Sequence, residues 1–158
     1  MFVNNFQRLA TLSAKPDVQF RITQPGGPVT FPDTPVTIPA DACFFWPYGF
    51  DLGHDLMLDW ATVQPICAVE DGTVRTLFFA ETPGVPSRLM IQGELKTVAP
   101  GRDAALTLTS SDQAKVRIVV LSQADSLALW KGEWRGRDRV FLTRSGLVLD
   151  GDVARCTA

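Results

Sequence analysis

Prolines and glycines interrupt this chain from end to end, and this punctuation limits its fold more than any other feature. Eleven prolines and twelve glycines are spread over 158 residues. Because proline cannot donate to a β-ladder and glycine supplies turn conformations, their wide distribution favours many short strands over long helices. With 46% apolar and 20% charged residues, the composition is that of a globular protein. We expect a single domain over residues 1–158.

Alternating apolar residues and turn chemistry predict more than ten strands. Val18–Thr23 alternates cleanly, and the Pro/Gly-rich turn Gln24–Pro28 returns it through Val29–Phe31 as a hairpin. The apolar runs Val74–Ala80 and Val116–Leu121 are predicted as central strands. The other expected strands are Phe2–Arg8, Thr34–Pro39, Cys43–Phe50, Leu56–Ala61, Pro65–Val69, Arg88–Gln92, Glu94–Val98, Ala105–Thr109, Arg139–Thr143 and Leu147–Leu149.

One short helix is expected near residues 123–131. Ser122 can cap its first turn, and Gly132 can end it. Leu127 and Trp130 fall three residues apart, on one face of such a helix. Many short strands with a single brief helix indicate an all-β fold, specifically an antiparallel β-sandwich.

Four aromatic side chains are predicted to share one face of an extended strand: Phe44, Trp46, Tyr48 and Phe50. Flat aromatic rings can stack on the apolar C–H faces of sugars. Trp46, Tyr48 and Trp60 are therefore candidate carbohydrate-binding residues. The alternative, which we favour, places these rings in the core or at a seam with a neighbouring domain, because large apolar side chains mostly serve packing.

Candidate metal ligands and catalytic groups are sparse. Asp51, Asp55 and Asp59 recur every four residues, a spacing that gathers carboxylates on a helix but not on the strands and loops predicted here. We interpret them as solvated acids rather than a calcium site, since no ligand loop matches. His54 is the only histidine, and without a nucleophile beside it we interpret it as a surface or hydrogen-bonded residue. We predict no catalytic residue, no metal site and no cofactor.

Charge and cysteine content narrow the classes of partner. The net charge of −2 argues against nucleic acid, which requires clustered Lys and Arg. The short basic run Arg135–Arg139 is interpreted as a hairpin tip. Cys43 and Cys67 lie in apolar strand patterns and are predicted as small core residues, with Cys156 as the third cysteine; one disulfide is allowed.

No segment approaches the roughly 20 apolar residues of a membrane span, so we expect no membrane partner. Residues 1–8 lack the basic start and long apolar core of a signal peptide. The compartment of the protein stays undetermined on this basis.

Several motifs carry a family resemblance through their order and spacing. The most distinctive is the aromatic block Phe45–Gly53, followed by Trp60–Pro65. The other segments are Phe2–Arg8, Val18–Phe20, Val36–Pro39, Phe78–Ala80, Pro83–Pro86 and Ala124–Lys131. Together they resemble the central, non-catalytic β domain of bacterial glycoside hydrolase family 35 β-galactosidases, in which a tyrosine often stands in place of Trp60. The resemblance runs from Phe2 to about Leu149.

This resemblance implies a supporting role beside a catalytic unit. In that family a (β/α)₈ barrel removes terminal β-linked galactose with retention of configuration, using two glutamates. The present chain lacks the repeating strand–helix pattern of a barrel, and none of its glutamates matches the catalytic context: Glu70, Glu81, Glu94 and Glu133. No catalytic role is carried over.

The expected function is therefore that of a non-catalytic accessory domain of a β-galactosidase. Its partners would be the catalytic barrel and neighbouring β domains of a parent enzyme that is periplasmic or extracellular. The alternative is a carbohydrate-binding module that recognises galactosides. A self-sufficient hydrolase is the least favoured reading, because no paired acid and base is visible.

Overall fold

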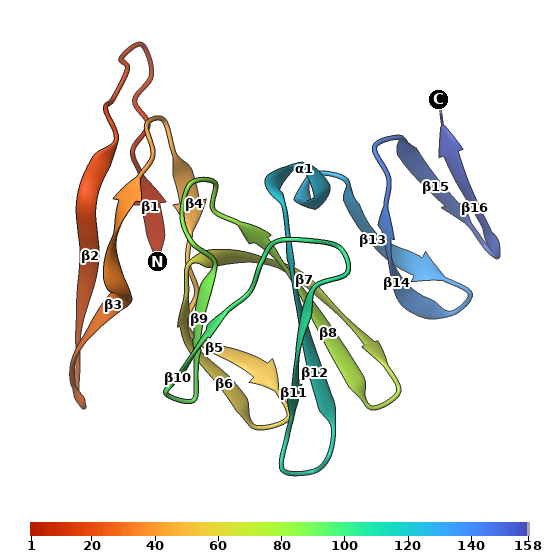
Figure 1. The fold of residues 1–158 in the computed structure, drawn as a ribbon. Helices are drawn as coiled ribbons and strands as arrows, with labels where there is room; N and C mark the ends of the chain where they lie inside the picture. The colour runs from red at the N-terminus through yellow and green to blue at the C-terminus, as the bar shows by residue number, and fades with distance from the viewer. Residues whose placement is uncertain (158) are drawn as a thin grey trace.

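Two four-stranded sheets packed face to face form the centre of the molecule (Figure 1). The structure, a computed structural model, describes residues 1–157. The first sheet contains β5 (Tyr48–Gly53), β6 (Leu56–Ala61), β9 (Arg88–Ile91) and β10 (Glu94–Thr97), in the order β10-β9-β6-β5. The second contains β7 (Val63–Asp71), β8 (Val74–Glu81), β11 (Ala105–Thr109) and β12 (Lys115–Leu121), in the order β11-β12-β8-β7.

The strand pairs in both sheets are antiparallel, apart from β12 with β8, which run parallel. Inward-facing apolar side chains from both sheets form the core. Leu58 and Leu89 of the first sheet lie in one cluster with Phe79 and Ile118 of the second, and all four are fully buried. Burying a side chain of this size contributes about 1.5–3 kcal/mol. The apolar side chains that alternate along each strand therefore hold the two sheets together.

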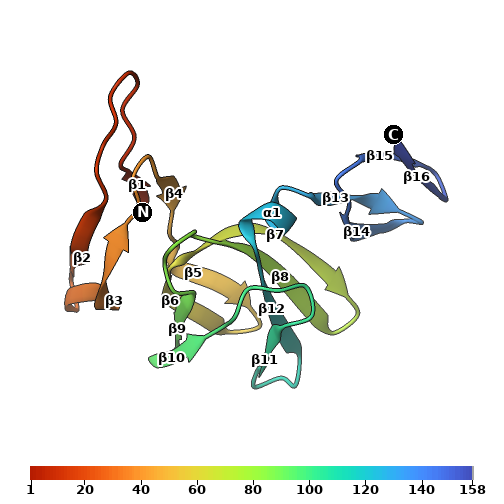
Figure 2. The same cartoon turned by 45° about the horizontal axis from the view of Figure 1, so that its top comes forward.

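A second, aromatic cluster joins the N-terminal strands to the sandwich. These strands are β1 (Phe2–Asn4), which pairs with β4 (Cys43–Phe45), and β2 (Lys15–Gln24), which pairs with β3 (Gly27–Ile38). Phe31 and Trp46 from this region are fully buried against Trp60 of β6. Figures 1 and 2 both show the β2–β3 hairpin standing along one side of the sandwich.

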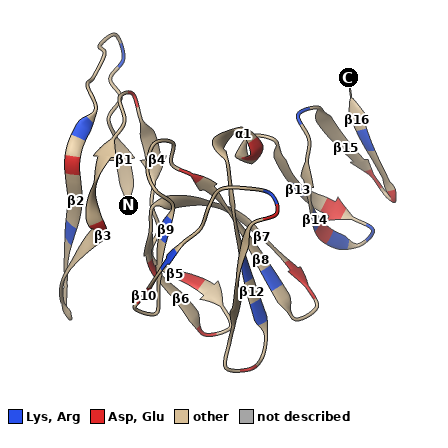
Figure 3. Ribbon diagram, viewed as in Figure 1, with Lys and Arg blue, Asp and Glu red and all other residues tan. Residues whose placement is uncertain are grey.

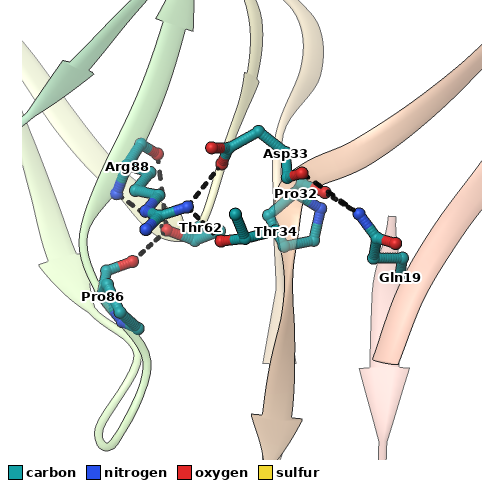
Figure 4. A network of polar contacts seen from close by, with 7 residues as sticks. All are labelled: Gln19, Pro32, Asp33, Thr34, Thr62, Pro86 and Arg88. Atoms are coloured by element: carbon teal, nitrogen blue, oxygen red, sulfur yellow. Dashed lines mark hydrogen bonds and ion pairs between the residues drawn. The ribbon is translucent and has the colours of Figure 1, made fainter. Parts of the chain in front are cut away.

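A polar network reinforces this attachment (Figure 4). The Arg88 guanidinium donates from Nη1 to Asp33 Oδ1 at 2.7 Å and to the Thr34 hydroxyl, which links β9 to β3. The buried Thr62 hydroxyl donates to the Pro86 carbonyl at 2.6 Å and accepts from the Arg88 amide at 2.9 Å. Buried polar groups that are fully hydrogen-bonded fix one arrangement of the chain.

The C-terminal part of the chain extends from the other side of the sandwich (Figures 1 and 2). A single helical turn, α1 (Gln123–Ser126), precedes two hairpins. The first hairpin pairs β13 (Leu129–Trp134) with β14 (Arg137–Leu142), and the second pairs β15 (Gly146–Asp150) with β16 (Val153–Thr157). We call residues 129–157 the C-terminal arm.

The all-β sandwich expected from the sequence is confirmed, as are the central positions of β8 and β12. The hairpin at Gln24–Pro28 and the hairpin tip within Arg135–Arg139 are also confirmed. Among the residues that the structure describes, no helix is long and apolar enough to cross a membrane.

The predicted helix is confirmed at its start but is shorter than expected. Ser122 Oγ accepts from the Asp125 amide, as predicted for a cap, yet the helix ends at Ser126. Trp130 lies instead on β13, paired with Phe141. The reason is the turn at Arg135, whose positive φ of 54° and that of the following glycine close a tight hairpin. The strand pairing in that hairpin hydrogen-bonds the backbone N–H and C=O groups that a longer helix would have paired internally.

Two expectations about the aromatic segment are wrong. Cys43–Phe50 is not one strand, because it breaks at Trp46 and Pro47 between β4 and β5. Cys43 is not a core residue but is exposed, since strand alternation turns its neighbour Phe44 inward. Cys67 is half-buried, and the three cysteines are free within residues 1–157.

Candidate ligand-binding hollow

Strand β5 turns its side chains from one core to the other within three residues. Tyr48 packs against the aromatic cluster, whereas Phe50 packs against the sandwich core. Residues two apart on a regular strand share a face, so the backbone must rotate between them. Gly49 permits this rotation, because its φ of +59° lies in the left-handed region that other residues adopt at a cost.

Strand β6 makes the same switch opposite Gly49. Leu58 faces Ile91 in the sandwich core, whereas Trp60 faces Met90 at the aromatic cluster. The pairing register between β6 and β9 shifts between these positions, so Asp59 is the extra residue of a β-bulge. The bulge and Gly49 together let one sheet serve two cores, and they leave Asp59 beside the site of the rotation.

An open hollow with a volume of about 530 Å³ lies at this switch point. Its size is within the range of small-molecule sites, roughly 300–1,000 Å³. Side chains and backbone from both the N-terminal hairpin and the first sheet contribute to it. The lining residues are Gln24, Val29, Thr30, Tyr48, Gly49, Asp59, Trp60, Met90 and Gly93.

The Tyr48 ring is the aromatic surface of this hollow, and it is held in place from two directions. Its ring stacks on Phe31, with ring centroids 5.6 Å apart and an interplanar angle of 28°. Phe31 in turn stacks on Trp60 at 5.9 Å. The Tyr48 hydroxyl donates to Gln24 Oε1 at 2.6 Å. A ring fixed in this way loses little conformational entropy when a ligand stacks on it.

Two polar side chains beside Tyr48 keep hydrogen-bonding capacity for a ligand. Asp59 Oδ2 accepts from the Gly93 amide at 2.8 Å, and Asp59 Oδ1 accepts no hydrogen bond from the described residues. Gln24 uses its Oε1 for Tyr48, while its Nε2 donates to no described residue. The hollow therefore offers a free acceptor and a free donor next to an aromatic face. Such a set suits a neutral ligand with several hydroxyl groups.

The structure separates the three predicted carbohydrate-binding residues. Tyr48 is half-buried and lines the hollow. Trp60 also lines it but is only 3% exposed. Trp46 is fully buried, and its indole Nε1 donates to the Thr82 hydroxyl at 2.9 Å. Sequence reasoning missed Gln24 and Asp59 as companions of Tyr48, because only the pairing register brings them together.

The three acids spaced by four do not converge. Asp51 accepts from the Gly53 amide at 2.7 Å within its own hairpin, whereas Asp59 lies at the hollow. His54 is half-buried, and its Nδ1 lies 3.5 Å from Asp112 Oδ2, which confirms a surface or hydrogen-bonded histidine. Within residues 1–157, no group of three His, Cys, Asp or Glu side chains is placed to hold a metal ion.

Within residues 1–157, three carboxyl groups have displaced pKa values, and all three are shifted downward. Hydrogen bonds from Lys96, Ser110 and Arg102 lower the pKa of Glu94, Asp112 and Asp125, respectively. Acids shifted in this direction stay ionised at neutral pH and do not suit a general acid, whose pKa must be raised.

Neither the known protein-family models nor the curated proteins give a match to this chain.

Proposed function

We propose that this chain is a non-catalytic accessory β domain of a β-galactosidase-type glycoside hydrolase, which supports a catalytic barrel outside the chain. The proposal starts from the resemblance of its ordered motifs to the central β domain of that family. The all-β fold is compatible with it. A domain that packs against a barrel should carry an exposed apolar surface when it stands alone.

The observation that carries the proposal is a pair of exposed phenylalanines. Phe2 of β1 and Phe45 of β4 are opposite each other in the antiparallel register. They leave 67% and 44% of their surfaces exposed, while the inward-facing pair Val3 and Phe44 packs in the aromatic cluster. Side chains directly opposite in a sheet lie about 4.5–5.5 Å apart at Cβ. Phe2 and Phe45 thus form a continuous apolar surface, which we call the Phe2–Phe45 patch.

The test begins with the reading frame around this segment, which should encode a (β/α)₈ barrel with two catalytic glutamates. Binding of the isolated domain to that barrel is then measured by calorimetry. The Phe2→Ser/Phe45→Ser variant should bind at least tenfold more weakly, because buried aromatic anchors dominate interface energies. Val153→Ser, on β16 at the far end of the molecule and 45% exposed, is the matched control. A frame without a barrel, or no binding of the unmodified domain to it, would refute the supporting role, and equal binding by both variants would refute the Phe2–Phe45 patch as the contact.

A carbohydrate-binding module for galactosides is the second candidate, favoured by the hollow at Tyr48. Its fixed aromatic face, the free Asp59 oxygen and the free Gln24 amide are the groups that a sugar ring uses. Galactose and methyl β-galactoside are titrated while NMR shifts are followed. Saturable shifts at Tyr48 and Gly93 are expected, and Tyr48→Ala or Asp59→Asn should abolish them. Phe6→Ala, an exposed aromatic outside the hollow, should leave them unchanged. Absence of a saturable response at millimolar sugar removes this candidate.

A further inference from the structure

The C-terminal arm lacks a core of its own. Not one of the described residues 129–157 is buried, and neither buried cluster of the molecule includes any of them. Each of its two sheets has only two strands. An isolated two-stranded hairpin is marginally stable in water at best. The arm must therefore take its position from what it contacts on the sandwich.

The root of the arm is fixed to the helical turn. Ala128, just before β13, is buried, and its carbonyl accepts from the Thr143 amide at 2.9 Å. Leu127, one residue earlier, is 83% exposed. This end of the arm is thus anchored by one small side chain, and the attachment of the remainder depends on contacts farther along β14.

Ion pairs attach the tip of the β13–β14 hairpin of the arm to the tip of the β7–β8 hairpin of the sandwich. Arg137 Nη1 lies 3.3 Å from Asp71 Oδ1, and Arg139 Nη1 lies 3.5 Å from Asp71 Oδ2. One carboxylate of the sandwich thus holds two guanidinium groups of the arm. Figure 3 shows the acidic end of β7 and the basic residues at the tip of the β13–β14 hairpin as opposite charges on these two elements.

An open cleft of about 960 Å³ separates the two hairpins beneath this contact. Charged side chains from both elements line it, namely Glu70, Asp71, Arg75, Lys131, Arg137 and Asp138. Two of the cations are paired on their own side, Arg75 with Glu70 at 3.1 Å and Lys131 with Asp138 at 2.8 Å. Among the described residues, the ion pairs that cross from the arm to the sandwich are those of Asp71.

The overall charges favour the same attachment. Residues 129–158 carry six Lys and Arg against four Asp and Glu, a net charge of +2. Residues 1–128 carry nine against thirteen, a net charge of −4. Opposite net charges attract the arm to the sandwich, and both partners at the contact are exposed, so dissolved salt screens the attraction.

We propose that the C-terminal arm is an electrostatically latched strap. Asp71 holds Arg137 and Arg139 to close the strap over the cleft, and raised ionic strength opens it. The opening is a rotation about the segment at Leu127 that leaves the two buried clusters intact, because neither cluster contains an arm residue. This inference goes beyond the proposed function and does not depend on it.

Amide hydrogen exchange followed by mass spectrometry tests the latch. Amides in residues 129–142 should exchange roughly two- to tenfold faster in 0.5 M than in 0.02 M NaCl, the range that two exposed ion pairs can supply. Asp71→Asn should show the fast rate already at low salt and lose the salt dependence. The Arg137→Gln/Arg139→Gln variant removes the two partners of Asp71, so its arm should also exchange fast at low salt and lose the salt dependence. Amides of β8 and β12 serve as the internal reference.

Glu94→Gln provides the matched control, because it removes the exposed pair with Lys96 on β10 without touching the arm. It should exchange like the unmodified protein. Arm exchange that responds neither to salt nor to Asp71→Asn overturns the latch.

Discussion

The two regions that flank the sandwich are both built of two-stranded sheets, yet they are attached by different forces. The N-terminal region buries Phe31 and Trp46 completely against Trp60 of the first sheet. The C-terminal arm buries none of its described residues and contacts the sandwich through the exposed carboxylate of Asp71. Hydrophobic burial is strong and insensitive to salt screening, whereas exposed ion pairs contribute about 0–1 kcal/mol each. The same strand architecture is therefore rigidly docked at one end and weakly docked at the other.

The difference in attachment between the two regions is tested most directly by replacing one tryptophan in each. Trp46→Ala leaves a large cavity and removes the indole N–H that the Thr82 hydroxyl accepts from, so it should lower the unfolding free energy by about 3–5 kcal/mol. Trp130→Ala removes a ring that is 42% exposed in the arm and should cost only about 1 kcal/mol. Urea denaturation followed by circular dichroism measures both. Equal losses would show that the arm is docked as firmly as the N-terminal region.

The rotation at Gly49 tests how the sheet supports the aromatic cluster. Gly49→Ala should lower the unfolding free energy by about 1–2 kcal/mol, because a Cβ disfavours the left-handed conformation. No atom lies within 4 Å of the added Cβ, so the loss would come from the backbone alone. Gly49→Asn should cost less, since asparagine tolerates this region. An equal cost for both substitutions would point to a packing effect instead.

Acid should destabilise the sandwich through Asp112, with a smaller effect than that of Gly49→Ala. The Ser110 hydroxyl, the Ala114 amide and then His54 lower the pKa of Asp112 in the folded state. A group with a lowered folded pKa contributes stability above its unfolded pKa, near 4, and loses it as the pH falls through the folded value. Urea midpoints at pH 6, 4 and 3 should fall less steeply in Asp112→Asn than in the unmodified protein. Identical slopes would exclude this contribution.

The smallest effect on global stability is expected at the latch. Asp71 is 60% exposed, so Asp71→Asn should change the unfolding free energy by less than about 0.5 kcal/mol while it accelerates exchange in the arm. A thermal scan and amide exchange on the same sample separate these effects. A loss above about 1 kcal/mol would mean that the arm unfolds together with the sandwich, and the two flanking regions would then be alike.

Local patterns in the sequence were sufficient for most of the strands. Leu56–Ala61 and Ala105–Thr109 match their predicted limits, because alternation and flanking turns define them without help from distant residues. The predicted helix failed beyond Ser126, since the periodicity of Leu127 and Trp130 also fits a strand. Pairing with Arg137–Leu142 decided between the two, and pairing is a tertiary effect.

The candidate site was predictable only in part. Tyr48 was identified because aromatic residues are conspicuous, and it lines the hollow. Trp46 has the same chemistry but is enclosed by the aromatic cluster, which no local pattern reports. Gln24 lies at the turn of the β2–β3 hairpin, and its side chain accepts a hydrogen bond from Tyr48, which is 24 positions away in the sequence. A contact at such a separation depends on register, and the sequence does not display register.

The sequence by itself determined the fold class, because prolines and glycines divide the chain into short alternating runs that can bury apolar faces only as sheets. Only the tertiary structure decided which face each run presents to which core. The bulge at Asp59 and the rotation at Gly49 reassign Tyr48 and Trp60 to the aromatic cluster, and the meeting of Asp71 with Arg137 positions the arm. Strand period is a local property of the chain, whereas register, bulges and charge pairing depend on segments that are distant in sequence.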